Sequence, residues 1–485
     1  MNKTMWINVG KTTIFLFLFC IIMAKAYSIL NYKSTGGGGG WQNFYNMEKE
    51  SADVIFVGSS HAHCTFDHGL LWDKYGITGY TLSAGSQKID AAYYFVKEAI
   101  EVQKPKIVVV EVWGAIGDQI VNSEESIYRN TFGMKWGSNH RNFVKDLVED
   151  MEEDSTYFKQ MLLKMPVIHS RYRELTQDDF INKEPYMRGY RGSYECEFFE
   201  KPEIISHQNI LELDVRSEKY LNKIIDLADE SNTELIFVVS PYCVNEKEQK
   251  RFNRISQIAE EEGIPMINFN YLYEEIGLDF SSDFRDVDHV NNYGAEKVTS
   301  YLADFIIEKY NLTSHKGEKD YEMWDLNSRY LSGKRNKKDL TDAIEVNEYL
   351  SQIIDMKDYI VMLSLNGNHT AAGDVYYEGL EKIGISYEQY LEGGMWILEK
   401  GEISCHLPGK EYTHILKKYN ITLSSQVTTL EDEEEKQNVE IMIDNLNHAF
   451  VENGLNVVIY DPVIDSVIDN AGTDIYLNFN MQRND

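Results

Sequence analysis

Two short segments carry the residue types needed for nucleophilic catalysis by a serine. In VGSSHA (57–62), Ser60 stands on a glycine-containing turn directly after an apolar run. In SSDFRDVDHVN (281–291), Asp286 precedes His289 by three residues. A serine hydroxyl is a poor nucleophile until a base removes its proton, and a carboxylate must hold that base in one tautomer. We therefore predict that Ser60, His289 and Asp286 serve as nucleophile, base and orienting carboxylate.

Three further features bear on that prediction. Gly85, in SAGSQ (83–87), can offer a backbone N–H to an oxyanion, as can Ser60 itself. Asp288 is a competing carboxylate, although its side chain should point away from His289 if the loop is extended. The plainer interpretation of Gly-Ser-Ser is a turn from a strand into a helix, without any chemistry.

A metal site is the alternative use of the histidines that follow the serine. His61 and His63, with Asp67 and His68, supply the ligand types. The spacing of His61 and His63 suits a strand, but this stretch is expected to enter a helix, so we favour polar residues at a pocket rim. The five cysteines form no Cys-x-x-Cys pair and no zinc-ligand spacing. We therefore expect neither a metal nor another cofactor.

The chain from 53 to 310 alternates between strand and helix patterns. Apolar, β-branched runs predict strands at 53–58, 79–83, 106–113, 234–241 and 264–269. Helices are expected at 91–103, 217–230, 246–263 and 292–310. This alternation predicts an α/β fold, a doubly wound parallel sheet with helices on both faces. In such sheets the site lies beyond the carboxyl ends of the strands, where Ser60, Gly85 and 286–289 stand.

The strand pattern lapses between about 118 and 215, so we expect a helical insertion or lid above the sheet. Its aromatic and basic run YMRGYRGSYE (186–195) contains Arg188, Tyr190 and Arg191. These side chains could bind substrate by lining a groove for sugar rings or an anionic polymer. The alternative is that they fold the insertion onto the sheet.

The first thirty residues indicate the compartment. Lys3 and Lys11 precede an uncharged apolar run at 12–24, which is the pattern of an export signal. An A-x-A site at 24–26 would permit cleavage, but we favour an uncleaved single-pass anchor with Lys25 reaching toward the outer interface. The bulk of the chain would then be extracytoplasmic and attached to the cell membrane.

These patterns divide the chain of 485 residues into four parts. They are the anchor or signal peptide (1–33), a flexible glycine-rich tether (34–50), the α/β domain (51–315) and a smaller α+β domain (318–485). In the last part, strands are expected at 359–367 and 455–461 and helices at 374–384 and 435–454. That part holds no cluster that predicts chemistry, and its role stays open.

The charge balance excludes one class of partner. Lys and Arg total 47 against 78 Asp and Glu, which gives a net charge of −31. A surface that acidic repels phosphate backbones, so we expect no nucleic-acid partner.

Taken together, the motifs resemble those of the SGNH (GDSL-type) hydrolase superfamily over about 53–310. The first, second and last blocks of that superfamily are similar to VIFVGSSHA (54–62), TLSAGSQ (81–87) and DVDHVNNYGAEKVTSYLADFI (286–306). The resemblance implies that Ser60 is the nucleophile, that Gly85 is the oxyanion-hole glycine, and that Asp286 and His289 complete a triad.

One block departs from the superfamily pattern. Its third block carries an Asn after the central strand, where this sequence reads VEVWGAIGD (110–118). One side-chain oxyanion donor is therefore unassigned, and loss of such a donor lowers rates by roughly 10²–10³. The layout is similar to the membrane-anchored branch, which includes the teichoic acid D-alanine transfer protein and the alginate-type O-acetylation proteins. The resemblance implies acyl-ester chemistry on a cell-surface polymer.

Two functions are compatible with these observations. The first is an extracytoplasmic serine esterase or O-acyltransferase that acts on a cell-surface polysaccharide. A transferase would need a separate multi-span membrane protein to deliver acyl groups, because this chain has at most one span. The second is a catalytically inactive SGNH-like scaffold that binds cell-surface glycan. Nothing in the sequence separates hydrolysis from transfer.

Overall fold

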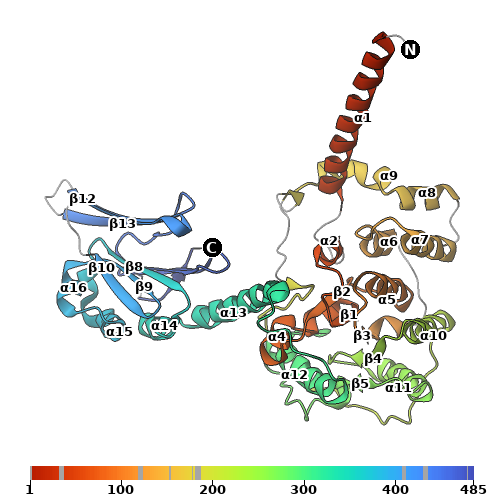
Figure 1. Ribbon diagram of the computed structural model, residues 1–485. Helices are drawn as coiled ribbons and strands as arrows, with labels where there is room; N and C mark the ends of the chain where they lie inside the picture. The colour runs from red at the N-terminus through yellow and green to blue at the C-terminus, as the bar shows by residue number, and fades with distance from the viewer. Residues whose placement is uncertain are drawn as a thin grey trace. The chain divides into compact units, whose positions relative to one another are not determined.

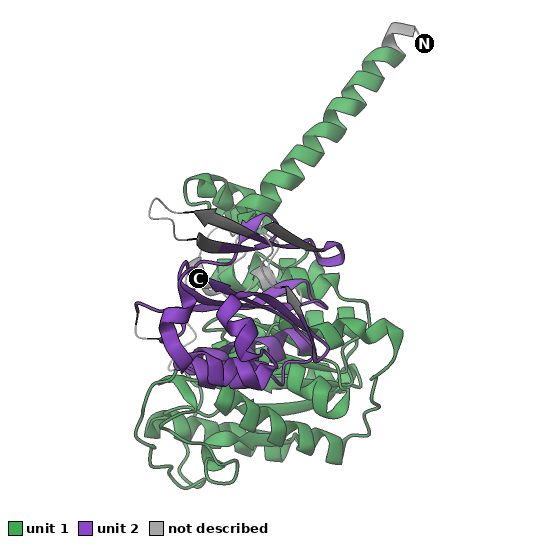
Figure 2. Ribbon diagram, turned by 90° about the vertical axis from the view of Figure 1, so that its left-hand side faces the viewer, with its two compact units in different colours: residues 1–328 green, residues 329–485 purple. Residues whose placement is uncertain are grey.

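The computed structural model describes the chain apart from residues 1–2, 32–37, 118–123, 152–154, 177–178, 181–186, 407–410, 430–434, 478 and 485. The chain forms two compact units, Met1–Ser328 and Arg329–Asp485 (Figure 2). The boundary lies after Ser328, and not at 315–318 as the sequence pattern suggested. Residues beyond 318 still pack within the first unit, since Trp72 Nε1 donates to Asp325 (2.7 Å).

A five-stranded parallel sheet forms the centre of the first unit (Figure 1). Its strands are β1 (Val54–Gly58), β2 (Gly79–Ser83), β3 (Ile107–Glu111), β4 (Glu234–Val239) and β5 (Met266–Asn268). Their order is β2-β1-β3-β4-β5, and every neighbouring pair is parallel. The predicted doubly wound α/β fold is confirmed. The strand order reverses between β1 and β3, and open sheets bind ligands at such a point.

Helices cover both faces of this sheet because alternate strand residues point to opposite sides. Ile55 and Val57 of β1 belong to one core, whereas Val54 and Phe56 belong to the other. The first core is covered by α5 (Ile89–Gln103), α10 (Val215–Glu230) and α11 (Glu246–Glu261), and the second by α4 (His68–Tyr75) and α12 (Asn292–Lys309). Strands buried on both faces are nearly continuous apolar runs. This pattern is why the strands could be predicted from the sequence.

The segment between β3 and α10 is an insertion with two different halves. Its helices are η1 (Trp113–Ala115), α6 (Glu124–Thr131), α7 (Ser138–Asp150), α8 (Ser155–Leu163), α9 (Met165–Ile168) and η2 (His169–Arg173). From 190 to 214 the chain has neither helix nor strand, so the prediction of a helical insertion is wrong for that half. Its backbone bonds go to neighbouring elements instead: Arg191 N–H donates to His63 O and Glu197 N–H to Phe284 O.

The helix α1 (Lys3–Leu30) precedes the sheet. Its segment Trp6–Leu30 is long and apolar enough to cross a membrane, and its apolar side chains are exposed as far as Met23. Length and composition of this kind suit a membrane anchor and also a signal sequence.

The tether predicted at 34–50 is wrong for its described part. Residues 34–37 lie outside the described residues, but α2 (Gly38–Asn46) follows at once as a helix. Its Trp41 and Phe44 are fully buried and pack against Phe95 and Tyr80. Burial of large aromatic rings outweighs the low helix propensity of the glycines at the start of this helix.

The second unit is built on two antiparallel sheets. The larger, of order β10-β9-β8-β15-β16-β17, comprises β8 (Ile360–Asn366), β9 (Gly394–Glu399), β10 (Glu402–His406), β15 (Gly454–Asp461), β16 (Ser466–Asp474) and β17 (Gln482–Arg483). The smaller comprises β11 (Glu411–Leu416), β12 (Ile421–Thr429), β13 (Glu435–Ile443) and β14 (Leu446–Asn447). The helices of this region are α13 (Glu322–Asp342), α14 (Val346–Ile353), α15 (Tyr377–Ile383) and α16 (Tyr387–Glu392). This is the α+β character expected of the C-terminal part.

The helix predicted at 435–454 is wrong, because this stretch forms β13 and the strands after it. Along β13, Val439, Ile441 and Ile443 are buried, while Glu440 between them is exposed. That alternation has the period of a strand with one buried face. Nine backbone partners on β12 hold β13 in an antiparallel pair.

Candidate active site

The chain turns sharply at the end of β1 and presents Ser60 at the start of a helix. Ser59 is the N-cap, and its hydroxyl accepts a hydrogen bond from His61 N–H (3.2 Å). The helix α3 (Ser60–Thr65) then begins with Ser60 as its first residue. Gly58 is required here, since a Cβ at this position would lie 2.7 Å from Glu111 Cβ. The packing of β1 on β3 therefore fixes where Ser60 stands.

Ser60, His289 and Asp286 form one hydrogen-bonded chain. Ser60 Oγ lies 2.7 Å from His289 Nε2, and His289 Nδ1 lies 2.8 Å from Asp286 Oδ1. With Nδ1–H donated to the carboxylate, Nε2 is the nitrogen left to take the serine proton. The His289 side chain is 14% exposed, so the base is sheltered but open on one side. The arrangement can remove the proton from Ser60 as its oxygen attacks an electrophile.

A two-stranded hairpin positions the acid and the base. It comprises β6 (Phe284–Asp286) and β7 (His289–Val290), and it pairs Asp286 directly with His289. The Asp286 carboxylate accepts further hydrogen bonds from Asp288 N–H (3.0 Å) and Arg285 Nε (3.1 Å). Partial burial raises the pKa of Asp286, but His289 and these hydrogen bonds outweigh it and bring the pKa below its usual value. Asp288 is exposed and donates its backbone N–H to Asp286, whereas the hydrogen bond of His289 Nδ1 goes to Asp286.

Gly85, the predicted oxyanion-hole glycine, follows a residue that is hydrogen-bonded to the nucleophile turn. Ala84 N–H donates to Gly58 O (3.3 Å), which holds the segment after β2 against the turn that carries Ser60. Gly85 follows, and its carbonyl accepts from Arg129 Nη1 (3.1 Å). Among the described residues, the N–H groups of Ser60 and Gly85 have no acceptor. Both are therefore available to an incoming oxygen.

Glu111 occupies the end of β3, and the sequence reasoning missed it. It is 1% exposed and accepts hydrogen bonds from Ser59 Oγ (2.9 Å) and Trp113 N–H (2.8 Å). Burial raises the pKa of Glu111 to about 7. The available signal was a lone glutamate at the last position of an otherwise apolar strand. In this structure the carboxylate, and not an amide, lies beneath the nucleophile turn.

His61 is buried beside the base and not at a pocket rim, which corrects the expectation from the sequence. Its ring stacks on Trp113 at a centroid distance of 5.2 Å, meets Tyr242 edge-on at 4.9 Å and lies 5.1 Å from the His289 ring. Burial and the adjacent His289 lower the pKa of His61 to about 3, so this imidazole is neutral. It forms an aromatic wall of the site next to the base.

The other candidate metal ligands have partners within the fold. His63 Nδ1 lies 3.0 Å from Ser83 Oγ, and His68 Nε2 lies 2.8 Å from Thr81 Oγ1. Asp67 caps α4 by accepting from Leu70 N–H. Within the described part of the chain, no group of three or more His, Cys, Asp or Glu side chains could hold a metal ion.

Two of the three predicted substrate-binding side chains are buried against neighbouring elements. The Arg188 guanidinium lies 4.4 Å from the Trp324 ring, and Tyr190 OH donates to Asn292 Oδ1 (2.6 Å). Thr81 N–H donates to Arg188 O (2.9 Å), so this segment lies along the edge strand β2. The prediction of a sugar-binding groove is wrong for Arg188 and Tyr190, because folding the insertion onto the sheet buries both.

Arg191 differs from these two residues. Its N–H donates to His63 O (2.6 Å), but the residue is only half-buried. It stays a predicted substrate contact. Tyr186, at the start of the same run, lies outside the described residues.

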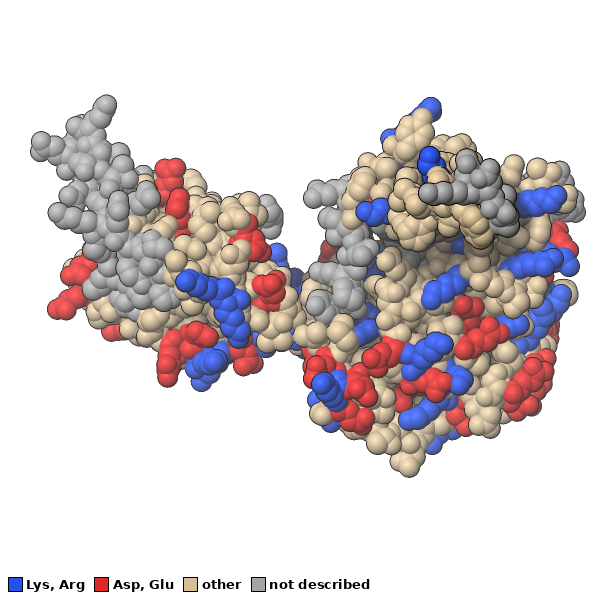
Figure 3. Space-filling model, turned by 45° about the horizontal axis from the view of Figure 1, so that its top comes forward, with Lys and Arg blue, Asp and Glu red and all other residues tan. Residues whose placement is uncertain are grey.

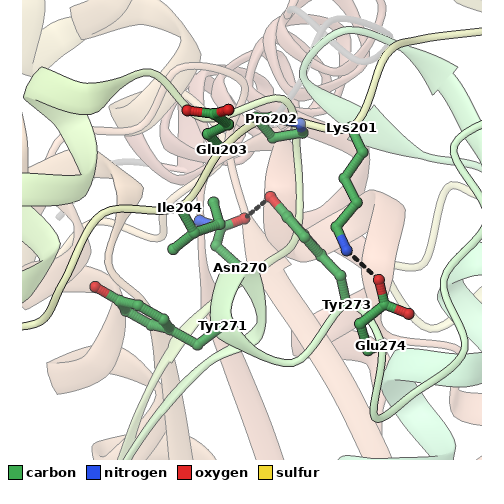
Figure 4. A pocket seen from close by; sticks show the side chains of 8 residues that line it. All are labelled: Lys201, Pro202, Glu203, Ile204, Asn270, Tyr271, Tyr273 and Glu274. Carbon is green, nitrogen blue, oxygen red and sulfur yellow. Dashed lines mark hydrogen bonds and ion pairs between the residues drawn. The ribbon is translucent and has the colours of Figure 1, made fainter.

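A hollow of about 570 Å³ lies between 201–204 and 270–274 (Figure 4). Lys201 pairs with Glu274 across it, and Tyr273 OH lies 2.7 Å from Asn270 Oδ1. Tyr273 OH also donates to Tyr242 O (2.6 Å), and Tyr242 packs on His61. Tyr273 and Tyr242 therefore connect the residues around the hollow with His61 beside the base. None of the triad residues lines the hollow.

Comparison with known proteins gives a distant likeness in structure alone. No protein-family model and no curated protein sequence matches this chain. Among solved structures, it is similar to an acylhydrolase from Bacteroides fragilis, at 12% identity and a TM-score of 0.27 over 55% of this chain and 94% of that one. It is also similar to the esterase EstA from Pseudoalteromonas (11%, TM-score 0.27, 54% and 100%) and to the acetyl xylan esterase AlAXEase (14%, TM-score 0.25, 53% and 98%). Likenesses of this size do not decide the chemistry.

Proposed function

We propose that this protein is an extracytoplasmic serine esterase or O-acyltransferase that acts on acyl esters of a cell-surface polysaccharide. The observation that carries the proposal is the continuous hydrogen-bonded chain from Ser60 Oγ through His289 to Asp286. Three residues from three separate elements meet there with the distances and order that nucleophilic acyl transfer needs. The placement outside the cytoplasm rests on α1 as a membrane span.

The first half-reaction forms an acyl-serine. Ser60 Oγ attacks the carbonyl carbon of the ester while its proton passes to His289 Nε2. The carbonyl oxygen becomes an oxyanion, which the N–H groups of Ser60 and Gly85 stabilise. Collapse of the tetrahedral intermediate breaks the bond to the leaving alcohol, which takes the proton from His289. Asp286 keeps the imidazole in the right tautomer and stabilises its charge during this exchange.

The second half-reaction decides between the two activities. Water or a sugar hydroxyl attacks the acyl-serine, His289 takes its proton, and Ser60 is released. In the transferase case, a separate multi-span membrane protein would deliver acyl groups to the outer face. Arg191, which is half-buried and follows the segment packed on β2, is the proposed contact to the polymer.

Covalent labelling with a fluorophosphonate tests the nucleophile directly. The reagent forms a bond between Ser60 Oγ and phosphorus and releases fluoride, so it reports an activated serine without knowledge of the substrate. We expect labelling of the full-length protein in detergent, and none in Ser60→Ala or His289→Ala. The exposed Ser206→Ala is the matched control and should label like wild type.

The second candidate is an inactive scaffold that binds glycan. The observation that favours it lies at the end of β3, where Glu111 stands and no Asn follows within 110–118, although the sequence resemblance expects an amide donor for the oxyanion after this strand. A folded wild-type protein that does not react with fluorophosphonate, and that binds cell-wall polysaccharide equally well after Ser60→Ala, would establish this candidate and exclude the first.

A further inference from the structure

Four large apolar side chains are exposed near the carboxyl end of α1, and we call them the interfacial cluster. Trp136, Leu163, Tyr172 and Phe180 are 65%, 50%, 60% and 63% exposed. They come from three places in the insertion: the loop before α7, the end of α8, and η2 with the residues after it. Apolar side chains that gather at one place on a surface mark an interaction site.

The end of α1 is fixed to the same part of the insertion. Arg171 Nη1 donates to the carbonyls of Leu30 (2.6 Å) and Asn31 (2.8 Å), and its Nη2 pairs with buried Asp179 (2.9 Å). The residues that follow Arg171 and Asp179 in the sequence are two members of the interfacial cluster, Tyr172 and Phe180. Any membrane that α1 crosses must therefore come close to these side chains.

A groove of about 380 Å³ lies beside this end of α1. Tyr27 and Asn31 line one part of it, and Phe132, Met134 and Trp136 line another. Its walls are mainly apolar, and one of them is a member of the interfacial cluster. The groove is thus continuous with both the cluster and the proposed membrane span, and it suits a lipid chain.

Leu163, the fourth member of the cluster, is held at the same groove by its neighbour. Lys164 follows it in the sequence, and its Nζ donates to the carbonyls of Phe132 (2.9 Å) and Met134 (2.8 Å). Because Lys164 is buried, the pKa of its ammonium falls to about 7. The lysine thus joins the end of α8 to the loop that carries Trp136.

Basic side chains accompany the part of the interfacial cluster from α8 to η2. Residues 155–176 contain four basic side chains and one acidic one, although residues 136–180 as a whole contain six basic and nine acidic ones. Of the four, Lys159 and Arg173 are exposed, and the Arg173 guanidinium lies 5.3 Å from the Tyr172 ring. Figure 3 shows the end of the first unit near α1 as a largely uncharged surface with scattered basic side chains, whereas acidic ones gather below it. Aromatic rings beside Lys and Arg are the residue types that favour the headgroup region of a bilayer.

We propose that the interfacial cluster seats in the outer leaflet of an anionic membrane around the end of α1, with the groove taking up lipid. The α/β unit would then be held to the bilayer surface by the insertion as well as by the span. This inference rests on α1 crossing the membrane, which belongs to the proposed function. It adds a lipid-binding surface that the catalytic site does not require.

A photoreactive lipid tests the contact. The full-length protein is placed in nanodiscs of phosphatidylglycerol, or of phosphatidylcholine alone, each doped with a phospholipid that carries a diazirine near its headgroup. Adducts are mapped by mass spectrometry after illumination. We expect adducts on the peptides with Trp136 and Tyr172, and more of them in phosphatidylglycerol. Phe198, which is 72% exposed in the segment after the cluster, is the control and should stay unlabelled.

Charge reversal provides the matched variants. Lys159→Glu with Arg173→Glu should lower adduct formation at the interfacial cluster by on the order of fivefold or more, since each cation near an anionic surface strengthens binding. Exposed Lys247 and Lys309 lie outside the insertion, and Lys247→Glu with Lys309→Glu should change nothing at the cluster.

The outcomes separate this inference from the proposed function. Adducts on α1 without adducts on the cluster, equal labelling in both lipids, or equal labelling of Phe198 would each overturn the interfacial surface while leaving the anchor intact. A lack of adducts on α1 itself would overturn the anchor and the surface together. Fluorophosphonate labelling of Ser60 is measured on the same samples and tests the catalytic proposal independently.

Discussion

Ser59 Oγ donates a hydrogen bond of 2.9 Å to Glu111 Oε2 directly beneath the residue that carries the candidate nucleophile. The same carboxylate accepts from Trp113 N–H, so it ties the turn after β1 to the turn after β3. These two strands meet at the point where the strand order reverses. A buried acid thus organises the loops at the place in the sheet where a ligand is expected.

This carboxylate makes stability depend on pH. The pKa of Glu111 is about 7 in the folded protein against an ordinary value of 4.5, because burial disfavours its charged form. Between these values the unfolded chain releases a proton that the folded protein keeps. The contribution of Glu111 to stability is therefore fully present below pH 4.5, falls as pH rises from 4.5 to 7 and levels off above 7. We expect Glu111→Gln to remove that fall. Its size is about 3 kcal/mol, since each unit by which the pKa is raised corresponds to roughly 1.4 kcal/mol of unfolding free energy.

Urea unfolding of the detergent-solubilised chain at pH 5 and pH 8 measures the effect. The difference in unfolding free energy between wild type and Glu111→Gln should shift in favour of the variant at the higher pH. The exposed Glu101→Gln is the control and should show no such shift. If the unfolding free energies of wild type and Glu111→Gln differ by the same amount at both pH values, the pKa of Glu111 is not raised by its burial.

Gly58 is the second structural requirement of the nucleophile turn. A methyl group there would lie 2.7 Å from Glu111 Cβ and 3.1 Å from Ala62 Cβ, so Gly58→Ala must push β1 and β3 apart or displace α3. We expect a loss of about 1–3 kcal/mol in stability, typical of overpacking, together with loss of fluorophosphonate labelling. Gly40→Ala is the matched control, because nothing lies within 4 Å of its added methyl group. Normal labelling of a folded Gly58→Ala protein would show that the turn tolerates a shift.

Asp286→Asn tests the role of the carboxylate in orienting the base. The amide keeps the shape of the side chain but can favour the wrong tautomer of His289, and such a change costs about 10⁴ in rate where a triad operates. We expect the rate of fluorophosphonate labelling to fall by a factor of this order while the fold is kept. Asp288→Asn changes the exposed neighbour and should label like wild type. Equal losses in both variants would assign the effect to the net charge of the loop and not to orientation.

The sheet and the order of its elements could be predicted because a strand buried on both faces is a nearly continuous apolar run in the sequence. β2 runs from Gly79 to Ser83, as the apolar run predicts, and α12 starts at Asn292, as expected. The contact between Asp286 and His289 could also be predicted from the sequence. The two residues are only three positions apart, and the hairpin pairs them directly. The approach of Ser60 to His289, over 229 positions in sequence, follows only from the topology of the whole sheet.

The features that the sequence did not predict depend on contacts between distant segments. Glu111 is a functional candidate only because Ser59 and Trp113 surround it in space. The glycine-rich start of α2 looked like a tether because the partners that bury Trp41 lie elsewhere in the chain. The run that holds Arg188 has the composition of a sugar-binding surface, but its backbone pairs with the edge of the sheet. Composition alone does not distinguish a residue that faces a ligand from one that faces the core.

Arg188→Ala tests which of these two uses that arginine has. Its guanidinium lies over the Trp324 ring and is buried, and Gly189 beside it approaches Thr81 O so closely that an added Cβ would lie 1.9 Å from that oxygen. We expect Arg188→Ala to lower the unfolding free energy by about 1–3 kcal/mol, through lost packing and cation–π contact. Once an acylated polymer substrate is identified, the KM of Arg188→Ala should equal that of wild type.

Arg191→Ala changes the half-buried neighbour. We expect this variant to show little change in stability and a higher KM. A raised KM with unchanged stability in Arg188→Ala would return that residue to the substrate site.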